Sequence, residues 1–172
     1  MKSTMMDSSL TLDRILRHGR TTFGGSVIAS FQGTGTRNGT FEQAGQRAEK
    51  LAAALRRLGV GPDDRVGTLC WNHQEHLEAY FAVPCMGAVL HTINFRLFPE
   101  QIAYIANHAE DKVLIVDPTI APLVAKVRSD LKTVQHVIVT GDGAETELGD
   151  DALAYEQLIG AEETGFAWPA ID

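Results

Sequence analysis

The sequence between residues 65 and 117 alternates short apolar runs with segments of helical period. The apolar runs cover residues 66–69, 88–93 and 113–116, and the segments of helical period cover residues 73–86 and 99–109. Runs that are apolar on both faces are typical of strands covered by helices on either side. Strands that alternate with helices predict right-handed βαβ units. We therefore expect an α/β fold with a doubly wound, mostly parallel sheet flanked by helices.

The segment before this core predicts an N-terminal β-hairpin. Apolar residues share one face of a predicted helix over residues 11–22. Residues 26–41 predict the hairpin, and the Asn38-Gly39 pair is a strong turn signal within it. The other glycines of this loop lie between two strands rather than between a strand and a helix, so a hairpin tip accounts for them better than a nucleotide-binding loop.

Local signals mark the ends of the next helices. Thr40 and Gln43 predict a capping box at the start of a helix over residues 40–58, and Gly59 predicts its left-handed end. Asn72 is the expected N-cap of the following helix, which Pro84 should bend or end.

The second half of the chain predicts one more strand and two more helices. An amphipathic helix is expected over residues 120–131, a fourth core strand over 134–140 and a short helix over 152–159. A glycine- and acid-rich loop, expected to be mobile, covers residues 141–150. The predicted sheet therefore has four core strands besides the hairpin.

Composition narrows the class of protein. The 172 residues carry a net charge of −7, and the tail from residue 142 onward holds nine Asp and Glu with no Lys or Arg. This balance disfavours nucleic acid as a partner. Cys70 and Cys85 lie in apolar segments and are expected to be buried thiols. We find no secretory signal and no transmembrane segment, and we expect a cytoplasmic protein.

Three motifs in the core carry a family resemblance. The segments GVGPDDRV, NHQEHLEAYFAVPCMGAVLHTINFRL and EQIAYIANHAEDKVLIVD stand in this order. They resemble the N-terminal region of acyl-CoA synthetases, which belong to the adenylate-forming, AMP-binding superfamily. The resemblance runs from about residue 5 to the end of the chain and favours the medium- and long-chain fatty acyl branch. It implies the first part of the large N-terminal domain of a fatty-acid–CoA ligase.

The resemblance also implies a chemistry. Such ligases join a fatty acid to ATP with Mg²⁺ and then transfer the acyl group to coenzyme A. The family's phosphate loop, rich in Ser, Thr and Gly, has no counterpart here, so we expect a chain truncated before that loop and inactive alone. We assign no catalytic, cofactor-binding or metal-binding residue to it. The expected division is an arm and helix over 1–25, the hairpin over 26–41, the βαβ core over 42–140 and the acidic tail over 141–172.

Two groups of residues are candidates for other roles. Asn94 and Arg96 follow a predicted strand, and ligands of parallel sheets bind where the strands end, so both are expected near substrate. The alternative is that Asn94 makes a turn and Arg96 pairs with an acid. His73 and His76 lie one helical turn apart, but no third ligand supports a metal site, and capping or solvent contact suits them better.

The N-terminus suggests self-association. The segment with Met5, Met6 and Asp7 resembles the segment through which dimeric ligases of this branch touch their neighbouring subunit. We therefore expect a homodimer, against the alternative that the terminus is disordered. A different reading of the whole chain also stays open, in which it is a free-standing α/β binding or oligomerisation module.

Overall fold

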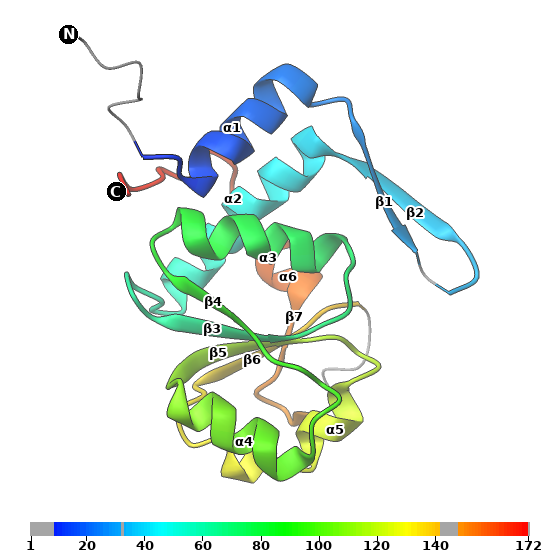
Figure 1. Cartoon of the computed structure of the whole chain (residues 1–172), viewed down its shortest axis with the longest axis vertical. Coiled ribbons are helices and arrows are strands. Elements are labelled where there is room, and N and C mark those ends of the chain that lie inside the picture. The colour runs from blue at the N-terminus through cyan, green and yellow to red at the C-terminus, as the bar shows by residue number, and fades with distance from the viewer. Residues whose placement is uncertain (1–8, 32, 142–147, 172) are drawn as a thin grey trace, which may run out of the picture.

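A parallel sheet forms the centre of the molecule. The computed structural model describes residues 9–31, 33–141 and 148–171. In this described part the main sheet has five strands, in the order β4–β3–β5–β6–β7 (Figure 1). The strands are β3 (Arg65–Leu69), β4 (Val89–Thr92), β5 (Asp111–Val116), β6 (His136–Val139) and β7 (Leu153–Ala154). The expected parallel sheet is confirmed, but the expected number of four core strands is wrong, because β7 adds a pair of residues beside β6.

Helices cover both faces of this sheet, as Figure 1 shows. One face carries α1 (Leu12–Phe23), α2 (Phe41–Arg57), α3 (Gln74–Cys85) and α6 (Tyr155–Gly160). The other carries α4 (Pro99–His108), α5 (Ala121–Ala125) and the 3₁₀ turn η1 (Arg128–Asp130). The doubly wound architecture is therefore confirmed. None of the helices in the described residues is long and apolar enough to cross a membrane.

Each face of the sheet has its own hydrophobic core, and β5 contributes to both. Its Val113 and Ile115 belong to the core beneath α2 and α3. Its Leu114 and Val116 belong to the core beneath α4 and α5. All four side chains are fully buried. Because successive side chains of a strand point to opposite faces, a central strand covered on both sides needs an unbroken apolar run, which is the pattern in the sequence.

The N-terminal hairpin is confirmed, but its turn is not where the sequence placed it. Strands β1 (Val27–Phe31) and β2 (Thr36–Thr40) pair antiparallel, and Asn38 and Gly39 lie inside β2. The chain reverses between the two strands, ahead of this pair. Gly39 serves a close approach instead, since a Cβ there would lie 2.7 Å from Oε1 of Gln74 on α3.

The ends of α2 follow their sequence signals. The Thr40 hydroxyl accepts the backbone N–H of Gln43, and the Gln43 side chain accepts the backbone N–H of Thr40. This reciprocal pair satisfies two N–H groups that a helix start leaves without partners. Gly59 follows the helix with φ of 84°, the left-handed conformation expected there.

The start of α3 corrects a prediction. His73, not Asn72, is its N-cap, and the ring Nδ1 of His73 lies 3.3 Å from the backbone nitrogen of His76. An imidazole nitrogen can occupy the position that a short Asn side chain was expected to fill. The far end agrees with the sequence, since the helix ends at Cys85, one residue after Pro84.

The helix expected over residues 120–131 is broken. Helix α5 ends at Ala125, and η1 follows it. Between them the N–H of Val127 donates to the carbonyl oxygen of Val124 at 3.0 Å. Such i to i+3 bonds tighten the chain to three residues per turn. This keeps Val124, Val127 and Leu131 in one core despite the break, which is why the apolar spacing looked continuous.

The last described residues return along the helices of the first face. The backbone N–H of Gly165 donates to Glu49 of α2 at 3.0 Å. Phe166 and Trp168 pack against the core beneath α2 and α3. The segment therefore ends beside α1 (Figure 1) without regular secondary structure. Most of the acidic loop expected over residues 141–150 lies outside the described residues.

Candidate functional site

The carboxyl ends of β3, β5 and β6 open into a cleft of about 720 Å³, which we call the carboxyl-edge cleft. Its walls come from the segments that follow these strands and from the hairpin. Residues 71–73 follow β3, residues 117–119 follow β5, and residues 140–141 follow β6. Parallel α/β sheets bind their ligands at this edge, so the cleft is the candidate functional site.

His73 lies between two carboxylates in the floor of this cleft. Its Nδ1 is 2.9 Å from Oε2 of Glu75, and its Nε2 is 3.2 Å from Oδ2 of Asp117. The second contact is close enough for an ion pair but outside hydrogen-bond geometry, because Nε2 has no hydrogen-bond partner among the described residues. Only 14% of the His73 side chain is exposed, so water screens these contacts poorly.

Arg37 extends the cluster to the hairpin. Its two terminal nitrogens donate to the two carboxylate oxygens of Glu75, each at 2.7 Å. A guanidinium and a carboxylate match in this two-bond geometry, which makes the pair both strong and directional. Arg37, Glu75, His73 and Asp117 thus form a row of alternating charge that joins β2, α3 and the end of β5. We call these four residues the edge cluster.

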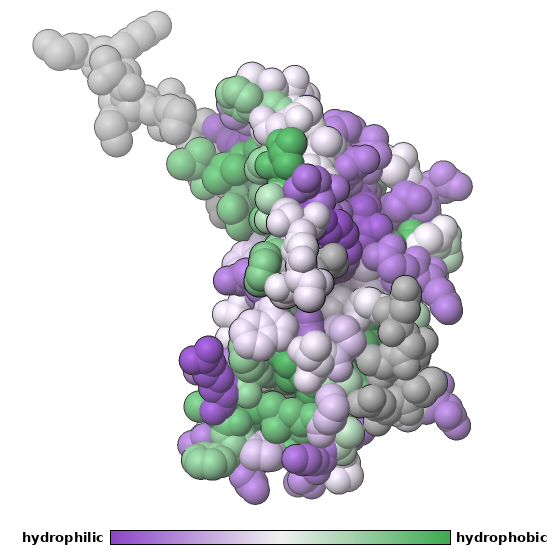
Figure 2. Space-filling view, turned by 90° about the vertical axis from the view of Figure 1, so that its right-hand side faces the viewer, coloured by the Kyte–Doolittle hydropathy of each residue, from purple (hydrophilic) through white to green (hydrophobic). Residues whose placement is uncertain are grey.

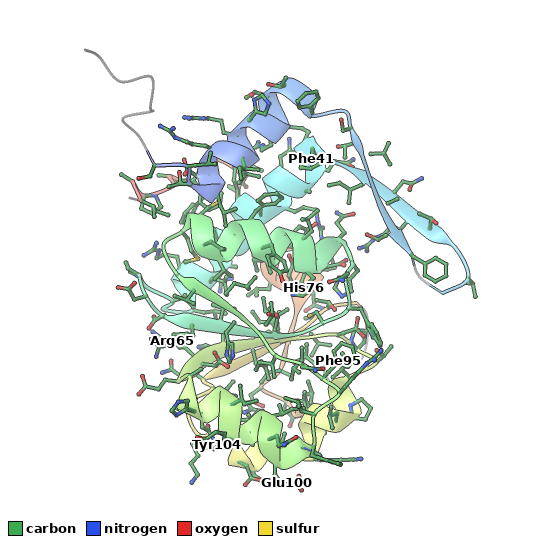
Figure 3. The ribbon with its side chains drawn as sticks, viewed as in Figure 1. Phe41, Arg65, His76, Phe95, Glu100 and Tyr104 are labelled. Atoms are coloured by element: carbon green, nitrogen blue, oxygen red, sulfur yellow. The ribbon has the colours of Figure 1, made fainter. Side chains whose placement is uncertain are left out.

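Thr119 links the far end of the edge cluster to an aromatic pair. Asp117 accepts the backbone N–H of Thr119 at 2.8 Å and its hydroxyl at 2.5 Å. The indole N–H of Trp71 donates to the same hydroxyl oxygen at 3.0 Å. The Trp71 ring packs against Phe95, with ring centroids 4.4 Å apart. Figure 3 shows Phe95 at this edge of the sheet, below His76.

The pKa shifts of the edge cluster have one common cause. Burial alone would lower the pKa of His73, but its contacts with Asp117, Cys70 and Glu75 outweigh burial and raise this pKa to about 11. Burial opposes the Glu75 and Asp117 carboxylates, yet His73 and, for Glu75, Arg37 hold their pKa values below the usual range. The whole cluster is therefore ionised at neutral pH. In this state Nδ1 of His73 carries a proton that it donates to Glu75, so it cannot at the same time accept the backbone N–H of His76.

A second buried cluster lies one turn further along α3. Glu78 is fully buried and accepts from Nε of Arg47 at 2.7 Å, Nε2 of Gln74 at 2.8 Å and the hydroxyl of Tyr155 at 2.7 Å. Arg47 also makes a two-bond pair with Glu156. We call Glu78 and these partners the core cluster. It ties α6 to α2 and α3, and burial raises the pKa of Glu78.

The cleft holds charges but no activated nucleophile. The Cys70 thiol donates to the carbonyl oxygen of Ile115 at 3.5 Å, and burial raises its pKa. Burial likewise raises the pKa of Cys85 to about 12. Both cysteines are buried and unpaired, as the sequence predicted. In the described residues no group of three His, Cys, Asp or Glu could hold a metal ion. The arrangement can order the strand-end segments.

The predicted site residues lie beside the cleft rather than in it. Asn94 and Arg96 follow β4, the outermost strand of the sheet. The Asn94 side chain accepts the backbone N–H of Arg96 at 3.0 Å, so Asn94 forms a turn. Arg96 is exposed, and within the described residues no carboxylate lies within ion-pair distance of it. Met5, Met6 and Asp7 lie outside the described residues.

Sequence reasoning missed the edge cluster. The strand-end rule that selected Asn94 and Arg96 applies equally to Asp117, which directly follows β5, and could have placed it beside residues 71–73. No sequence pattern pointed to Arg37, because its partner Glu75 lies 38 residues further along the chain.

Comparisons with known proteins agree with this architecture. The model of the AMP-binding enzyme family matches residues 19–164. The chain is 52% identical to a long-chain-fatty-acid–CoA ligase of Thermus thermophilus over 93% of its own length and 29% of that protein. It is 37% identical to a medium-chain-fatty-acid–CoA ligase of Ectopseudomonas oleovorans over its full length and 32% of that protein.

A solved structure gives the same result. The chain aligns with the crystal structure of a putative long-chain-fatty-acid CoA ligase from Rhodopseudomonas palustris at a TM-score of 0.79 and 28% identity, over 94% of this chain and 39% of that one. The chain thus spans about a third of the length of the curated relatives it matches. Since the family model covers most of the sequence, the chain belongs to the AMP-binding enzyme family, the adenylate-forming enzymes whose N-terminal region its motifs resemble.

Proposed function

We propose that the whole protein is an ATP-dependent fatty acyl-CoA ligase and that this chain is its N-terminal part. Such a ligase joins a fatty acid carboxylate to ATP, which gives an acyl-adenylate and pyrophosphate. It then transfers the acyl group to the thiol of coenzyme A and releases AMP. The observation that carries the proposal is the 52% identity with the Thermus ligase over nearly the entire chain.

ATP, Mg²⁺ and coenzyme A belong in this proposal to the whole enzyme. The described residues do not fit a nucleotide or a metal by themselves. Their glycine-containing hairpin stands between two strands rather than before a helix, and they contain no metal-binding cluster. We therefore expect that this chain alone catalyses no step of the reaction. A cytoplasmic location completes the proposal, because two buried, unpaired thiols suit a reducing compartment.

Within the enzyme, the Asn94–Arg96 turn is proposed to lie near substrate. It follows a strand at the edge where parallel sheets bind ligands. Fatty acids, ATP and coenzyme A are all anionic, and Arg96 presents a guanidinium that no carboxylate of the described residues neutralises. A free guanidinium at such an edge suits a phosphate or a carboxylate.

A pyrophosphate-release assay tests the proposal. The full-length enzyme, given ATP, coenzyme A and saturated fatty acids of several lengths, should release pyrophosphate and form the acyl-CoA. The 172-residue chain should match a no-protein control, and Arg96→Ala in the full-length enzyme should raise a substrate KM. A full-length enzyme that activates no fatty acid would overturn the assignment. Activity of the isolated chain would overturn the statement that the chain is inactive alone.

The proposal includes a homodimer in which Met5, Met6 and Asp7 touch the neighbouring subunit. Met side chains adapt to irregular contact surfaces, and Asp7 can pair with a basic residue across a two-fold axis. Sedimentation equilibrium on the complete chain and on a version starting at Leu10 separates the outcomes. A dimer that dissociates on truncation supports the contact. A monomer in both cases removes the dimer, and a dimer in both moves the contact elsewhere.

A further inference from the structure

The β1–β2 hairpin carries an apolar face that nothing in the described residues covers. Its strand β1 alternates, with Val27, Ala29 and Phe31 exposed, Ser30 buried and Ile28 between the two. Val27 is 65% exposed and Phe31 is 73% exposed. In a strand, such alternation means that one face packs inward, here toward α3, while the other faces outward. We call the exposed side of Val27, Ala29 and Phe31 the outer hairpin face.

The hairpin also has free edges. Within the described residues β1 pairs with β2 alone, and β2 pairs with β1 alone. Each strand therefore has one side whose backbone N–H and C=O groups are not paired in a ladder. Two-stranded hairpins are marginally stable, and open edges are templates for another strand. Figure 1 shows the hairpin extending away from the helices, which leaves room for such a strand.

A further exposed apolar side chain lies next to the hairpin. Phe23, at the end of α1 just before the hairpin, is 54% exposed. Figure 2 faces the side from which the hairpin extends, and its upper half shows hydrophobic residues beside hydrophilic ones. Exposed apolar surface that adjoins an open strand edge is typical of a site where another segment binds.

From these features we infer that the outer hairpin face and a free hairpin edge bind a strand from the remainder of the same ligase polypeptide. This inference rests on the proposed function, because the relatives carry about two thirds of their length outside the matched region. The strand adds to the hairpin by backbone hydrogen bonds and places apolar side chains on Val27 and Phe31.

The size of the site favours a tethered occupant over a separate molecule. Each hairpin strand has five residues, about 17 Å of chain. One face of so short a ribbon offers far less than the roughly 800 Å² per partner that stable complexes bury. A segment of the same polypeptide has already lost most of the translational freedom that a free partner must lose on binding, so a small contact suffices for it.

A strand bound at this site would also affect the carboxyl-edge cleft. Arg37 lies in β2, and its two-bond pair with Glu75 is the first link of the edge cluster. A strand bound to the hairpin would hold β2 in place and, through Arg37, hold the edge cluster. The hairpin thus connects the downstream polypeptide to the edge of the sheet where ligands bind.

Hydrogen exchange compares the site in the two forms of the protein. Amides of residues 27–31 and 36–40 should exchange at least about tenfold more slowly in the full-length enzyme than in the 172-residue chain. Equal exchange in both forms would overturn the inference. Protection that appears only when the 172-residue chain dimerises at high concentration would also overturn it, in favour of a second copy.

Two phenylalanines provide a matched substitution. Phe31 and Phe98 are each 73% exposed, and Phe98 precedes α4 on the other side of the sheet. Phe31→Ala should lower the urea midpoint of the full-length enzyme but not that of the 172-residue chain. Phe98→Ala replaces one poor N-cap of α4 by another and should leave both midpoints unchanged. An unchanged full-length midpoint for Phe31→Ala counts against the inference. A full-length protein that protects the hairpin yet activates no fatty acid would overturn the proposed function alone.

Discussion

Helix α3 carries two buried carboxylates three residues apart, and their surroundings shift their pKa values in opposite directions. Glu75 belongs to the edge cluster, where His73 and Arg37 lie within 2.9 Å and hold its pKa below the usual range. Glu78 belongs to the core cluster, where burial raises its pKa although Arg47 lies 2.7 Å away. Both side chains are at most 7% exposed, so burial alone does not explain the difference.

The number of cations around each carboxylate determines the direction of its pKa shift. Glu75 contacts two cations, Arg37 and His73, and shares only His73, with Asp117. Glu78 contacts one cation, Arg47, which it shares with Glu156, and its other two partners are neutral groups. Neutral donors compensate less of the lost hydration than a second cation does. The edge cluster is therefore stabilised by charge. In the core cluster the buried Glu78 carboxylate has hydrogen-bond partners, but its burial costs free energy of desolvation. The cluster fixes the position of α6.

The largest expected effect is on the core cluster. Glu78→Ala removes the acceptor of three donors and leaves the Arg47 guanidinium and the Tyr155 hydroxyl without this partner. We expect the free energy of unfolding to fall by about 4 kcal/mol, because the change breaks a buried ion pair and leaves the buried Tyr155 hydroxyl without its acceptor, although Arg47 keeps Glu156. Equilibrium urea unfolding, followed by circular dichroism, measures the change.

Two variants sharpen this result. Glu78→Gln keeps the shape of the side chain and an oxygen acceptor, so it should lose less stability than Glu78→Ala. Glu75→Ala should cost about 2 kcal/mol, because Arg37 can turn to water and His73 keeps Asp117. The contrast between the clusters is wrong if Glu75→Ala destabilises the chain more than Glu78→Ala does.

The next effect is a pH dependence that belongs to the edge cluster. The pKa of His73 is 6.5 in the unfolded chain and about 11 in the folded one. Between these values the folded state holds a proton that the unfolded state has lost. The stability from His73 is thus fully present below pH 6.5 and falls as the pH rises, by up to about 1.4 kcal/mol per pH unit. Urea unfolding between about pH 7 and about pH 7.5 measures this slope and stays at least about one unit below the pKa of an unfolded cysteine.

Replacement of the His73 imidazole tests whether this group causes the pH dependence of stability. His73→Gln should be less stable at pH 7 and should show a flatter slope over this range. His108→Gln, which lies on α4 outside both clusters, should keep the slope of the unmodified chain. An unchanged slope in His73→Gln would mean that another group carries the titration. At acid pH, the lowered pKa values of Glu75 and Asp117 predict a separate loss of stability as the pH falls below about 4.

Most of the fold could be predicted because its signals are local. The period of the apolar residues gave the strands of the sheet and the helices on both faces, and Thr40, Gln43 and Gly59 gave the ends of α2. The errors lie where tertiary packing overrides a local signal. Strand β7 pairs through only two residues, too few to show a period. The Asn38-Gly39 pair serves the contact with α3 rather than the turn.

The candidate site was less predictable. The strand-end rule led to the edge of the sheet where the carboxyl-edge cleft lies and selected Asn94 and Arg96, whose role near substrate stays a prediction. The edge cluster could not be predicted, because its residues come together only through tertiary contacts. Arg37 approaches Glu75 only because the hairpin lies over the start of α3, and His73 meets Asp117 only because β3 and β5 are neighbours.

The smallest effect is expected at the junction of the edge cluster with Trp71. Thr119→Val keeps the shape of the side chain but removes the hydroxyl that donates to Asp117 and accepts from the indole. The site is partly exposed, so water can replace these bonds, and the loss should be about 1 kcal/mol. The indole, however, loses its only fixed hydrogen bond in the described residues. In a Trp168→Phe background, where Trp71 is the single tryptophan, fluorescence anisotropy should fall as the ring becomes more mobile. Thr140→Val is the control in the same cleft, because the Thr140 hydroxyl donates to a backbone carbonyl and does not touch Trp71. Equal anisotropy in the Thr119 and Thr140 variants would show that the packing of Trp71 on Phe95, rather than the hydrogen bond, holds the ring at the carboxyl edge.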